Sequence, residues 1–255
     1  MSGRLFVIGL GPGSADQVTP EALGAVRQAR EFYGYKPYLD RLSLAEGQVA
    51  HASDNREEIS RAEAALTRAA EGVDVAVVSG GDPGVFAMAA AVCEAIEHGP
   101  AAWREVELTV VPGVTAMLAV AARAGAPLGH DFCAISLSDN LKPWELVESR
   151  LDAASRAGFV IALYNPISKA RPWQLGKAFG LLRENLPGAT PVIFGRAAGR
   201  PDERIVISAL SEARPEQADM ATCILIGSSE TRLIERSGKP PLVYSPRSAA
   251  PAGRI

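Results

Sequence analysis

Cysteine, histidine and long apolar runs are all scarce in this chain of 255 residues, and each shortage excludes a class of protein. The three cysteines, Cys93, Cys133 and Cys223, lie far apart and form no Cys-x-x-Cys pair, which excludes a zinc pattern and a disulfide framework. Three separated histidines likewise make no metal site, so we expect no metal. The apolar run Leu5–Leu10 is too short for a signal peptide or a membrane span. We therefore expect a cytoplasmic protein that binds no membrane.

An excess of charge of one sign is also missing. Lys and Arg number 26 against 29 Asp and Glu, which gives a formal net charge of -3. A protein that binds the phosphate backbone of a nucleic acid needs a basic surface, and the sequence has no basic stripe. We therefore expect no nucleic-acid partner. Hydrophobic residues make up 47% of the chain, an ordinary globular value that argues against disorder.

The chain does contain a repeated order of apolar strand, glycine turn and helix. Unbroken apolar runs bounded by glycine and proline predict strands buried on both faces, as in a parallel sheet. The first half has such strands at 5–10, 73–79 and 107–111, a helix that begins at Pro20 behind the N-cap Thr19, and helices at 56–71 and 86–97. In the helix at 56–71, the spacing of Ile59, Ala62, Leu66 and Ala69 predicts the buried face.

A second unit of the same kind follows. Strands are predicted at 132–137, 158–164, 191–194, 205–208 and 222–226, and helices at 143–154 and 173–184. The stretch Gly125–His130 is the best linker candidate because it contains Gly and Pro. We therefore expect two α/β domains, 1–125 and 130–245, and a mobile tail at 246–255.

Three glycine-rich turns follow the predicted strands of the first half. The turn Gly9–Ser14 departs from the dinucleotide-binding pattern, because serine replaces the third glycine and Pro12 lacks an N–H. The turn Ser79–Gly84 also contains the carboxylate of Asp82. The turn Pro112–Ala116 is a further glycine turn, and it directly follows the next predicted strand. Ligands of open α/β sheets bind at the carboxyl ends of strands, so these turns predict a ligand site. A structural turn, with Thr115 as a helix N-cap, is the alternative.

The order and spacing of these turns resemble those of the tetrapyrrole methylases. The Gly-x-Pro-Leu stretch from Gly125 and the Arg-Pro-Asp-Glu-Arg turn from Arg200 extend the similarity over roughly residues 4–228. Within that family, three segments resemble the ring-contracting precorrin methylases: Gly34–Tyr38, Ser53–Glu58 and Tyr164–Arg171. The resemblance implies methylation of precorrin-3B at C17, coupled to ring contraction, in cobalamin biosynthesis.

The resemblance also implies a fold, an assembly and a cofactor. It implies two α/β domains with the active site in the cleft between them, and a homodimer. The cofactor would be S-adenosylmethionine, with S-adenosylhomocysteine as product. By the same resemblance, the residues that hold it would be Pro12, Gly80, Gly81, Asp82, Val85, Thr115, Ala116, Asn165 and Ala198.

Ring contraction moves protons, and therefore needs an acid or a base. Asp54 is the first candidate, and the alternative is that it only caps the helix that follows. Ser138 and Asp139 are further catalytic candidates, although a plain turn fits them as well. A precorrin carries several carboxylates, so the substrate is expected to contact polar residues and bare backbone. The candidates for these contacts are Gly13, Ser14, Ser53, Asn55, Arg56, Asn140, Lys169 and Arg171.

Other functions stay open at this point. The substrate could be another precorrin position or a cobalt-loaded ring, or a macromolecule, as in the related RNA and diphthine methylases. A nicotinamide-dependent oxidoreductase is disfavoured by the defective glycine pattern. A binding module without catalysis is disfavoured by the three ligand-lining turns.

Overall fold

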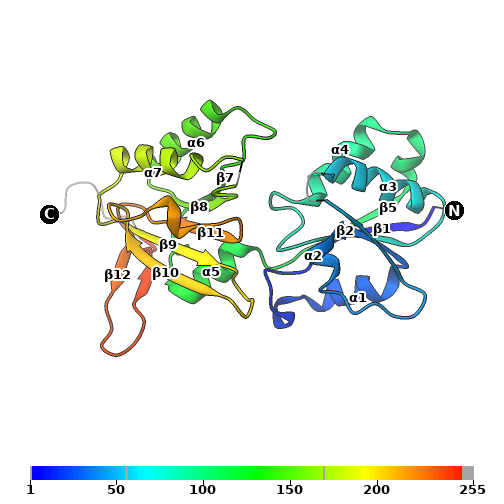
Figure 1. Cartoon of the computed structure of the whole chain (residues 1–255), viewed down its shortest axis with the longest axis horizontal. Helices are drawn as coiled ribbons and strands as arrows, with labels where there is room; N and C mark the ends of the chain where they lie inside the picture. Colours follow the sequence, from blue (N-terminus) through cyan, green and yellow to red (C-terminus); the bar gives the residue numbers. More distant parts are fainter. Residues whose placement is uncertain (1, 55–56, 169, 249–255) are drawn as a thin grey trace. The chain divides into compact units, whose positions relative to one another are not determined.

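The computed structural model describes residues 2–54, 57–168 and 170–248, and the chain divides into two compact units (Figure 1). The first unit ends at Thr115 and the second begins at Ala116. The first domain expected from the sequence, 1–125, also includes helix α5 (Ala116–Ala124). This helix contacts strands β9, β10 and β11, which belong to the second unit. The expected mobile tail lies outside the described residues from position 249 onward.

The first unit is built on a five-stranded sheet in which all strands are parallel. The order is β3-β2-β4-β1-β5. The strands are β1 (Arg4–Gly9), β2 (Glu31–Tyr35), β3 (Val49–Ser53), β4 (Val75–Ser79) and β5 (Glu107–Val111). The predicted parallel sheet is confirmed, and β2 and β3 are strands that the apolar runs did not reveal.

Helices cover both faces of this sheet (Figure 1). Successive residues of β1 point to opposite faces, so Leu5 and Val7 join one core while Phe6 and Ile8 join the other. The first core includes α3 (Glu58–Ala70), α4 (Met88–His98) and the short helix η2 (Ala101–Glu105). The second includes α1 (Pro20–Gln28) and α2 (Lys36–Leu39), and η1 (Ala15–Gln17) precedes α1.

The buried face of α3 differs from the predicted one at two positions. Ala62, Leu66 and Ala69 are buried as predicted, but Ile59 is 45% exposed. Arg61 is buried instead. The helix is therefore turned slightly from the expected orientation, and it carries a charged side chain into the core.

The second unit has a mixed five-stranded sheet in the order β10-β9-β11-β8-β7. Only β7 and β8 are parallel neighbours, and β9, β10 and β11 pair antiparallel. The elements are β7 (Phe132–Ser136), α6 (Trp144–Arg156), β8 (Val160–Tyr164), α7 (Gln174–Asn185), β9 (Pro191–Arg196), β10 (Arg204–Ala209), η3 (Pro215–Gln217) and β11 (Thr222–Ile226). Helices α6 and α7 pack in one core with the sheet. Helix α5 approaches β9 so closely that a Cβ at Gly195 would lie 2.1 Å from Val120 Cγ2.

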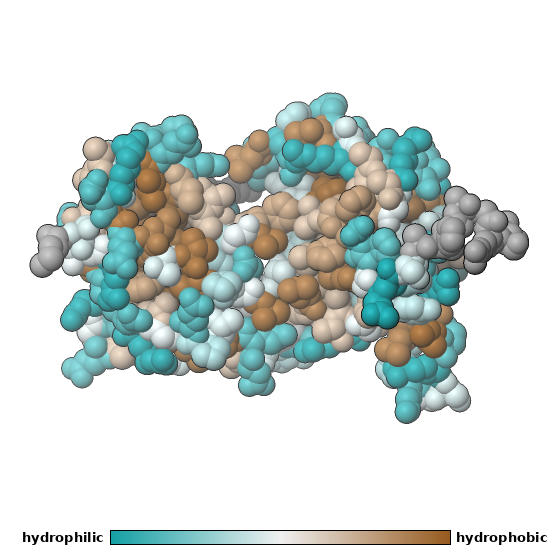
Figure 2. All heavy atoms as spheres, turned by 180° about the vertical axis from the view of Figure 1, so that it is seen from behind, coloured by the Kyte–Doolittle hydropathy of each residue, from teal (hydrophilic) through white to brown (hydrophobic). Residues whose placement is uncertain are grey.

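A small three-stranded sheet, in the order β12-β13-β6, completes this unit. It joins β6 (Gly125–Ala126), β12 (Arg232–Ile234) and β13 (Leu242–Tyr244). The β12–β13 hairpin projects from the unit (Figure 1), and Figure 2 shows apolar spheres on it, where Leu233 and Ile234 are exposed. Within the described ranges, no helix combines the length and the apolar character needed to cross a membrane.

Candidate functional site

The three glycine turns of the first unit meet at the carboxyl ends of β1, β4 and β5, which are neighbours in the sheet. The first two turns are joined by a pair of backbone hydrogen bonds. The Gly11 N–H donates to Gly81 O at 3.1 Å, and the Gly81 N–H donates to Gly11 O at 2.8 Å. Both glycines have a left-handed backbone, with φ of 67° and 69°, which residues with a Cβ rarely adopt.

The Asp82 carboxylate joins the second turn to the third. Its Oδ1 accepts the N–H of Gly84 at 2.8 Å, and its Oδ2 accepts the N–H of Gly113 at 3.0 Å. The sequence predicted a ligand contact for Asp82, and the geometry adds a structural role within the turns. Each carboxylate oxygen keeps a further lone pair, so the role in the turns leaves acceptor capacity for a ligand.

Bare backbone is what these turns present. A Cβ at Gly113 would lie 2.3 Å from Gly81 O, and a Cβ at Gly9 would lie 2.7 Å from the same oxygen. A Cβ at Gly80 would lie 2.7 Å from a ring carbon of Tyr38. The turns are therefore packed so closely that glycine is required, and the backbone can approach a ligand without side chains between them.

The other predicted residues of these turns occupy defined positions. Pro12 is buried, and Gly13 and Val85 are half-buried. The Val85 N–H donates to Asp82 O at 3.3 Å. Ser14 accepts the N–H of Asp16 at 3.3 Å, which caps η1. Ser14 thus has a local structural role beside its predicted substrate contact.

The predicted proton-transfer segment lies at the end of β3 and is held by Arg61. Arg61 Nε donates to Ser53 Oγ at 2.8 Å, and Arg61 Nη2 donates to Asp54 O at 2.6 Å. Burial lowers the pKa of Arg61. Asp54 is exposed, and α3 begins behind the N-cap Glu57. The predicted substrate residues Asn55 and Arg56 lie outside the described residues.

Sequence reasoning missed Arg61, although the signal is present. Arg61, Ala65 and Ala69 are spaced by four residues and therefore lie on one line of the helix. Two small apolar residues on that line mark it as a packed face. An arginine in such a row predicts a buried guanidinium with polar partners near the helix start.

In the second unit, the carboxyl ends of β7, β8 and β9 lie at the same edge of the sheet, because β8 and β9 both run antiparallel to β11. Asn165 follows β8 with a left-handed φ of 51°, and its Nδ2 donates to Ser136 Oγ at 2.9 Å. Tyr164 accepts the N–H of Met117 at 3.0 Å. This bond brings the start of α5, and with it Ala116, to the end of β8.

A polar cluster lies on the loops that follow β7 and β8. Arg171 Nη1 lies 2.8 Å from Asp139 Oδ1 in an ion pair, and the same nitrogen donates to Asn140 Oδ1. Ser138 accepts the N–H of Asn140 at 3.4 Å, as in an ordinary turn. The structure thus brings together Asp139, Asn140 and Arg171, while Lys169 lies outside the described residues.

Among the described residues, several buried polar atoms in and beside these two loops have no hydrogen-bond partner. They include Ser168 Oγ and Arg171 Nε on one loop and Trp144 Nε1 at the start of α6. Buried polar groups are normally paired, by protein, water or ligand. The unpaired donors fit the expectation that this region meets an acceptor such as a carboxylate.

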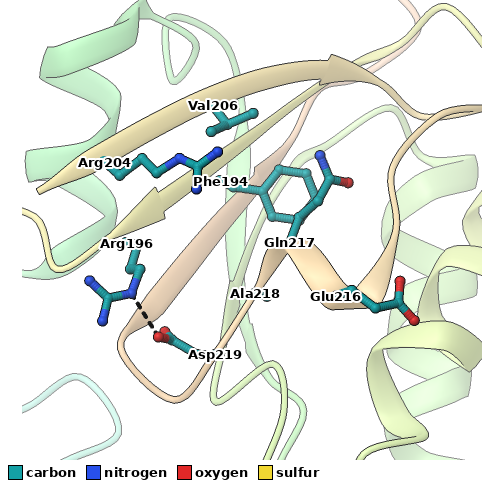
Figure 3. Close-up of a pocket in the computed structure, with 8 residues that line it drawn as sticks. All are labelled: Phe194, Arg196, Arg204, Val206, Glu216, Gln217, Ala218 and Asp219. Carbon is teal, nitrogen blue, oxygen red and sulfur yellow. Dashed lines mark hydrogen bonds and ion pairs between the residues drawn. The ribbon is translucent and has the colours of Figure 1, made fainter.

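A separate pocket of about 320 Å³ lies beside β9, β10 and η3 (Figure 3). Its lining residues are Phe194, Arg196, Arg204, Val206, Glu216, Gln217, Ala218 and Asp219. Arg196 Nε lies 2.7 Å from Asp219 Oδ2, and the two charges neutralise one another. The pocket contains none of the predicted site residues. We therefore place the candidate site at the strand ends and assign this pocket no ligand.

Within the described part of the chain, no group of three or more His, Cys, Asp or Glu could hold a metal ion. The candidate residues of the first unit are bare backbone turns with one turn carboxylate, and those of the second unit are polar loops at strand ends. Backbone turns of this kind are suited to an extended organic ligand that is held mainly by backbone groups.

Known proteins include relatives that match this chain over most of its length. The family model of the tetrapyrrole (corrin/porphyrin) methylases matches residues 4–214. The chain is 70% identical over 254 residues to the precorrin-3B C(17)-methyltransferase of Sinorhizobium sp, with 100% of both chains covered. It is 41% identical to a probable cobalt-factor III C(17)-methyltransferase of Salmonella typhimurium, with 89% of this chain and 93% of the relative covered.

Solved structures show the same relationship. The crystal structure of the methyltransferase CobJ matches with a TM-score of 0.91 and 51% identity, and covers 96% of this chain and 100% of its own. A uroporphyrin-III C-methyltransferase from Thermus thermophilus, complexed with S-adenosylhomocysteine, matches with a TM-score of 0.66 and 25% identity, over 89% of this chain and 98% of its own. The fold and site define a two-domain α/β methyltransferase. The chain belongs to the tetrapyrrole methylase family.

Proposed function

We propose that the chain transfers a methyl group from S-adenosylmethionine to C17 of precorrin-3B, coupled to ring contraction to precorrin-4, in cobalamin biosynthesis. The observation that carries this proposal is the 70% identity, over the full length of both chains, to the Sinorhizobium precorrin-3B C(17)-methyltransferase. The match spans the whole chain, and so includes the segments that contain the glycine turns and both polar loops.

The residues of the strand ends fit the cofactor. When bound, S-adenosylmethionine supplies an electrophilic methyl group and leaves as S-adenosylhomocysteine. In the first unit, the backbone of Gly80, Gly81 and Thr115 and the remaining lone pairs of Asp82 would hold its polar groups. The residues of the second unit that would hold it are Ala116, Asn165 and Ala198. Pro12 and Val85 would add apolar contacts.

Methyl transfer itself asks little of the protein beyond position. An electron-rich ring carbon attacks the methyl carbon, and the electrons of the broken bond go to sulfur. Holding the two reactants in line can lower such a barrier by about 7–11 kcal/mol. The closely packed turns around Gly9, Gly81 and Gly113 are suited to this task because they leave the backbone little freedom.

Ring contraction needs a proton donor or acceptor, and we assign this role to Asp54. Asp54 is exposed, and Arg61 holds its backbone. Ser138 and Asp139 are the second candidates. Arg171 and Asn140 would bind substrate carboxylates, which requires Arg171 to exchange its ion pair with Asp139 for the ligand. Gly13, Ser14, Ser53, Asn55, Arg56 and Lys169 complete the proposed substrate contacts.

A cobalt-loaded substrate is the second candidate, because the Salmonella relative is named for cobalt-factor III. The identity of 41% to that protein, against 70% to the Sinorhizobium enzyme, favours the metal-free ring. Parallel assays with precorrin-3B and with cobalt-factor III, each followed by mass and absorbance, test this choice. Methylation of precorrin-3B alone, or much faster, is the expected result. Methylation of the cobalt ring alone would reverse the assignment.

The homodimer and the cytoplasmic location expected from the sequence stay proposals. Sedimentation equilibrium of the purified chain tests the first of them. We expect a mass of twice 26.8 kDa, and a single-chain mass at all concentrations would contradict the dimer.

A further inference from the structure

The turn between β9 and β10 is held by a carboxylate to which the proposed function gives no role. Glu203 Oε2 accepts the N–H of Gly199 at 2.6 Å, and Glu203 Oε1 accepts from Arg123 Nε at 2.9 Å. Arg123 lies at the end of α5, and the start of α5 is bound to Tyr164. One carboxylate therefore joins the turn that carries Ala198 to the helix that meets β8.

The backbone of this turn needs support. Ala197 has a left-handed φ of 49°, which is strained for a residue with a Cβ. Ala197 and Ala198 are only 4% and 6% exposed, so the turn is packed into the unit. The Ala197 N–H donates to Ala221 O at 2.9 Å, and Ala197 O accepts the N–H of Arg200 at the same distance. Glu203 accepts the N–H of Gly199, two residues beyond Ala197, and so also holds this part of the turn.

The hydrogen bonds that Glu203 accepts favour its ionised form. Burial raises the pKa of Glu203, but the hydrogen bonds from Gly199 and Arg123 outweigh it, and the net pKa is lowered. The neighbouring Asp202 has a different partner and is more exposed. Asp202 pairs with Arg196 at 2.6 Å, and its side chain is 60% exposed, against 25% for Glu203. Two adjacent carboxylates of one turn thus have different surroundings, which provides a matched control.

We propose that Glu203 is a positioning residue for the cofactor: through Gly199 it fixes the backbone of Ala198 at the end of β9, and through Arg123 it ties that backbone to α5. The proposal rests on the proposed function, since Ala198 is one of the residues assigned to S-adenosylmethionine. Glu203 itself touches no reacting atom in this account. A backbone held in advance binds a ligand more tightly because less freedom is lost on binding.

Calorimetric titration with S-adenosylhomocysteine tests this role in four full-length proteins: wild type, Glu203→Ala, Glu203→Gln and Asp202→Asn. Glu203→Ala should raise Kd by about tenfold or more, as expected for losing a charge-assisted hydrogen bond. Glu203→Gln keeps an oxygen that can accept the Gly199 N–H, so its Kd should rise less. Asp202→Asn should leave Kd within about twofold, since it touches only an exposed ion pair.

Steady-state kinetics separate positioning from simple loss of structure. A positioning role predicts a raised KM for S-adenosylmethionine with little change in kcat once the cofactor saturates. Partial unfolding would lower the amount of active enzyme and leave KM unchanged. Amide hydrogen exchange adds a readout at the atom concerned, and the Gly199 N–H should exchange faster in Glu203→Gln than in wild type.

The possible failures are distinguishable. Equal Kd values in wild type and both Glu203 variants would overturn the positioning role and leave the proposed function intact. A loss in Asp202→Asn as large as in Glu203→Ala would also overturn it, because any charge on the turn would then suffice. If Glu203→Ala does not fold, Glu203→Gln and its exchange rate decide. A folded wild type that binds no S-adenosylhomocysteine would instead overturn the proposed function.

Discussion

Substitution of Gly113 by alanine should separate the glycine turns of the first unit. Its Cβ would lie 2.3 Å from Gly81 O and 2.9 Å from the carbonyl carbon and oxygen of Gly9. Ordinary contact needs roughly 1 Å more, and the nearest atoms are backbone, so the third turn must move. Overpacking of this kind costs about 1–3 kcal/mol in the free energy of unfolding. The movement would also stretch the 3.0 Å bond from the Gly113 N–H to Asp82.

Loss of that charge-assisted bond predicts a fall in affinity for S-adenosylhomocysteine of about tenfold or more. Urea unfolding gives the change in stability, and calorimetric titration gives the affinity. Gly84→Ala is the matched control, because a Cβ there would meet only Asp82 Oδ1, at 3.2 Å, which is the end of a side chain. Equal stability and equal affinity in Gly113→Ala and Gly84→Ala would show that the three glycine turns do not depend on their close packing at Gly113.

Four further results are expected. Asp54→Asn should keep cofactor affinity but slow ring contraction by about 10²–10⁴-fold in single-turnover product analysis, and wild-type rates would move the acid to another residue. Tyr164→Phe removes the acceptor of the Met117 N–H and should weaken S-adenosylhomocysteine binding in calorimetry, whereas an unchanged Kd would make this bond irrelevant to the site. Gly195→Ala drives a Cβ into α5 and should lower the free energy of unfolding by about 1–3 kcal/mol in urea, while wild-type stability would show that α5 can shift. The hydrogen bond from Arg4 lowers the pKa of Asp74 below its ordinary 3.8, so its stabilisation is complete above that pH and is lost as the pH falls through the lowered pKa. Acid unfolding of Asp74→Asn should therefore lack part of the wild-type dependence on pH, and identical curves would contradict this.

Strands β1 and β4 could be predicted from the sequence because they are buried on both faces, and such strands are continuous apolar runs. The edge strand β5 is more exposed, and like the other two it is bounded in the sequence by a glycine or proline. The start of α1 was also predictable, since Thr19 Oγ1 accepts the N–H of Ala22 as an N-cap should. The glycine turns then followed from the strand ends.

Strands β2 and β3 could not be predicted in this way. β2 lies inside the sheet but contains a glycine and begins with a charged residue, and most of β3 is exposed, so neither gives a continuous apolar signal. The place of α5 in the second unit could not be predicted, because α5 follows directly on Thr115, whereas its packing partners β9, β10 and β11 come much later in the chain. Contacts so distant in sequence leave no local signal.

The site shows the same limit. Composition and spacing indicated which turns carry glycine, but not that Asp82 would bind Gly113, or that Arg61 would hold Ser53. Those partners are set by the order of the strands in the sheet. Glu203 was visible only as part of a family-like motif, and its role depends on a contact with Arg123, 80 residues away.

The most direct test of the proposed function is one turnover with precorrin-3B and S-adenosylmethionine that carries a ¹³C-labelled methyl group, followed by ¹³C NMR of the product. We predict that the label is found on C17 of a ring-contracted macrocycle, with one methyl transferred per ring. Label at another ring position, or none transferred by a folded protein that binds both ligands, would contradict the account.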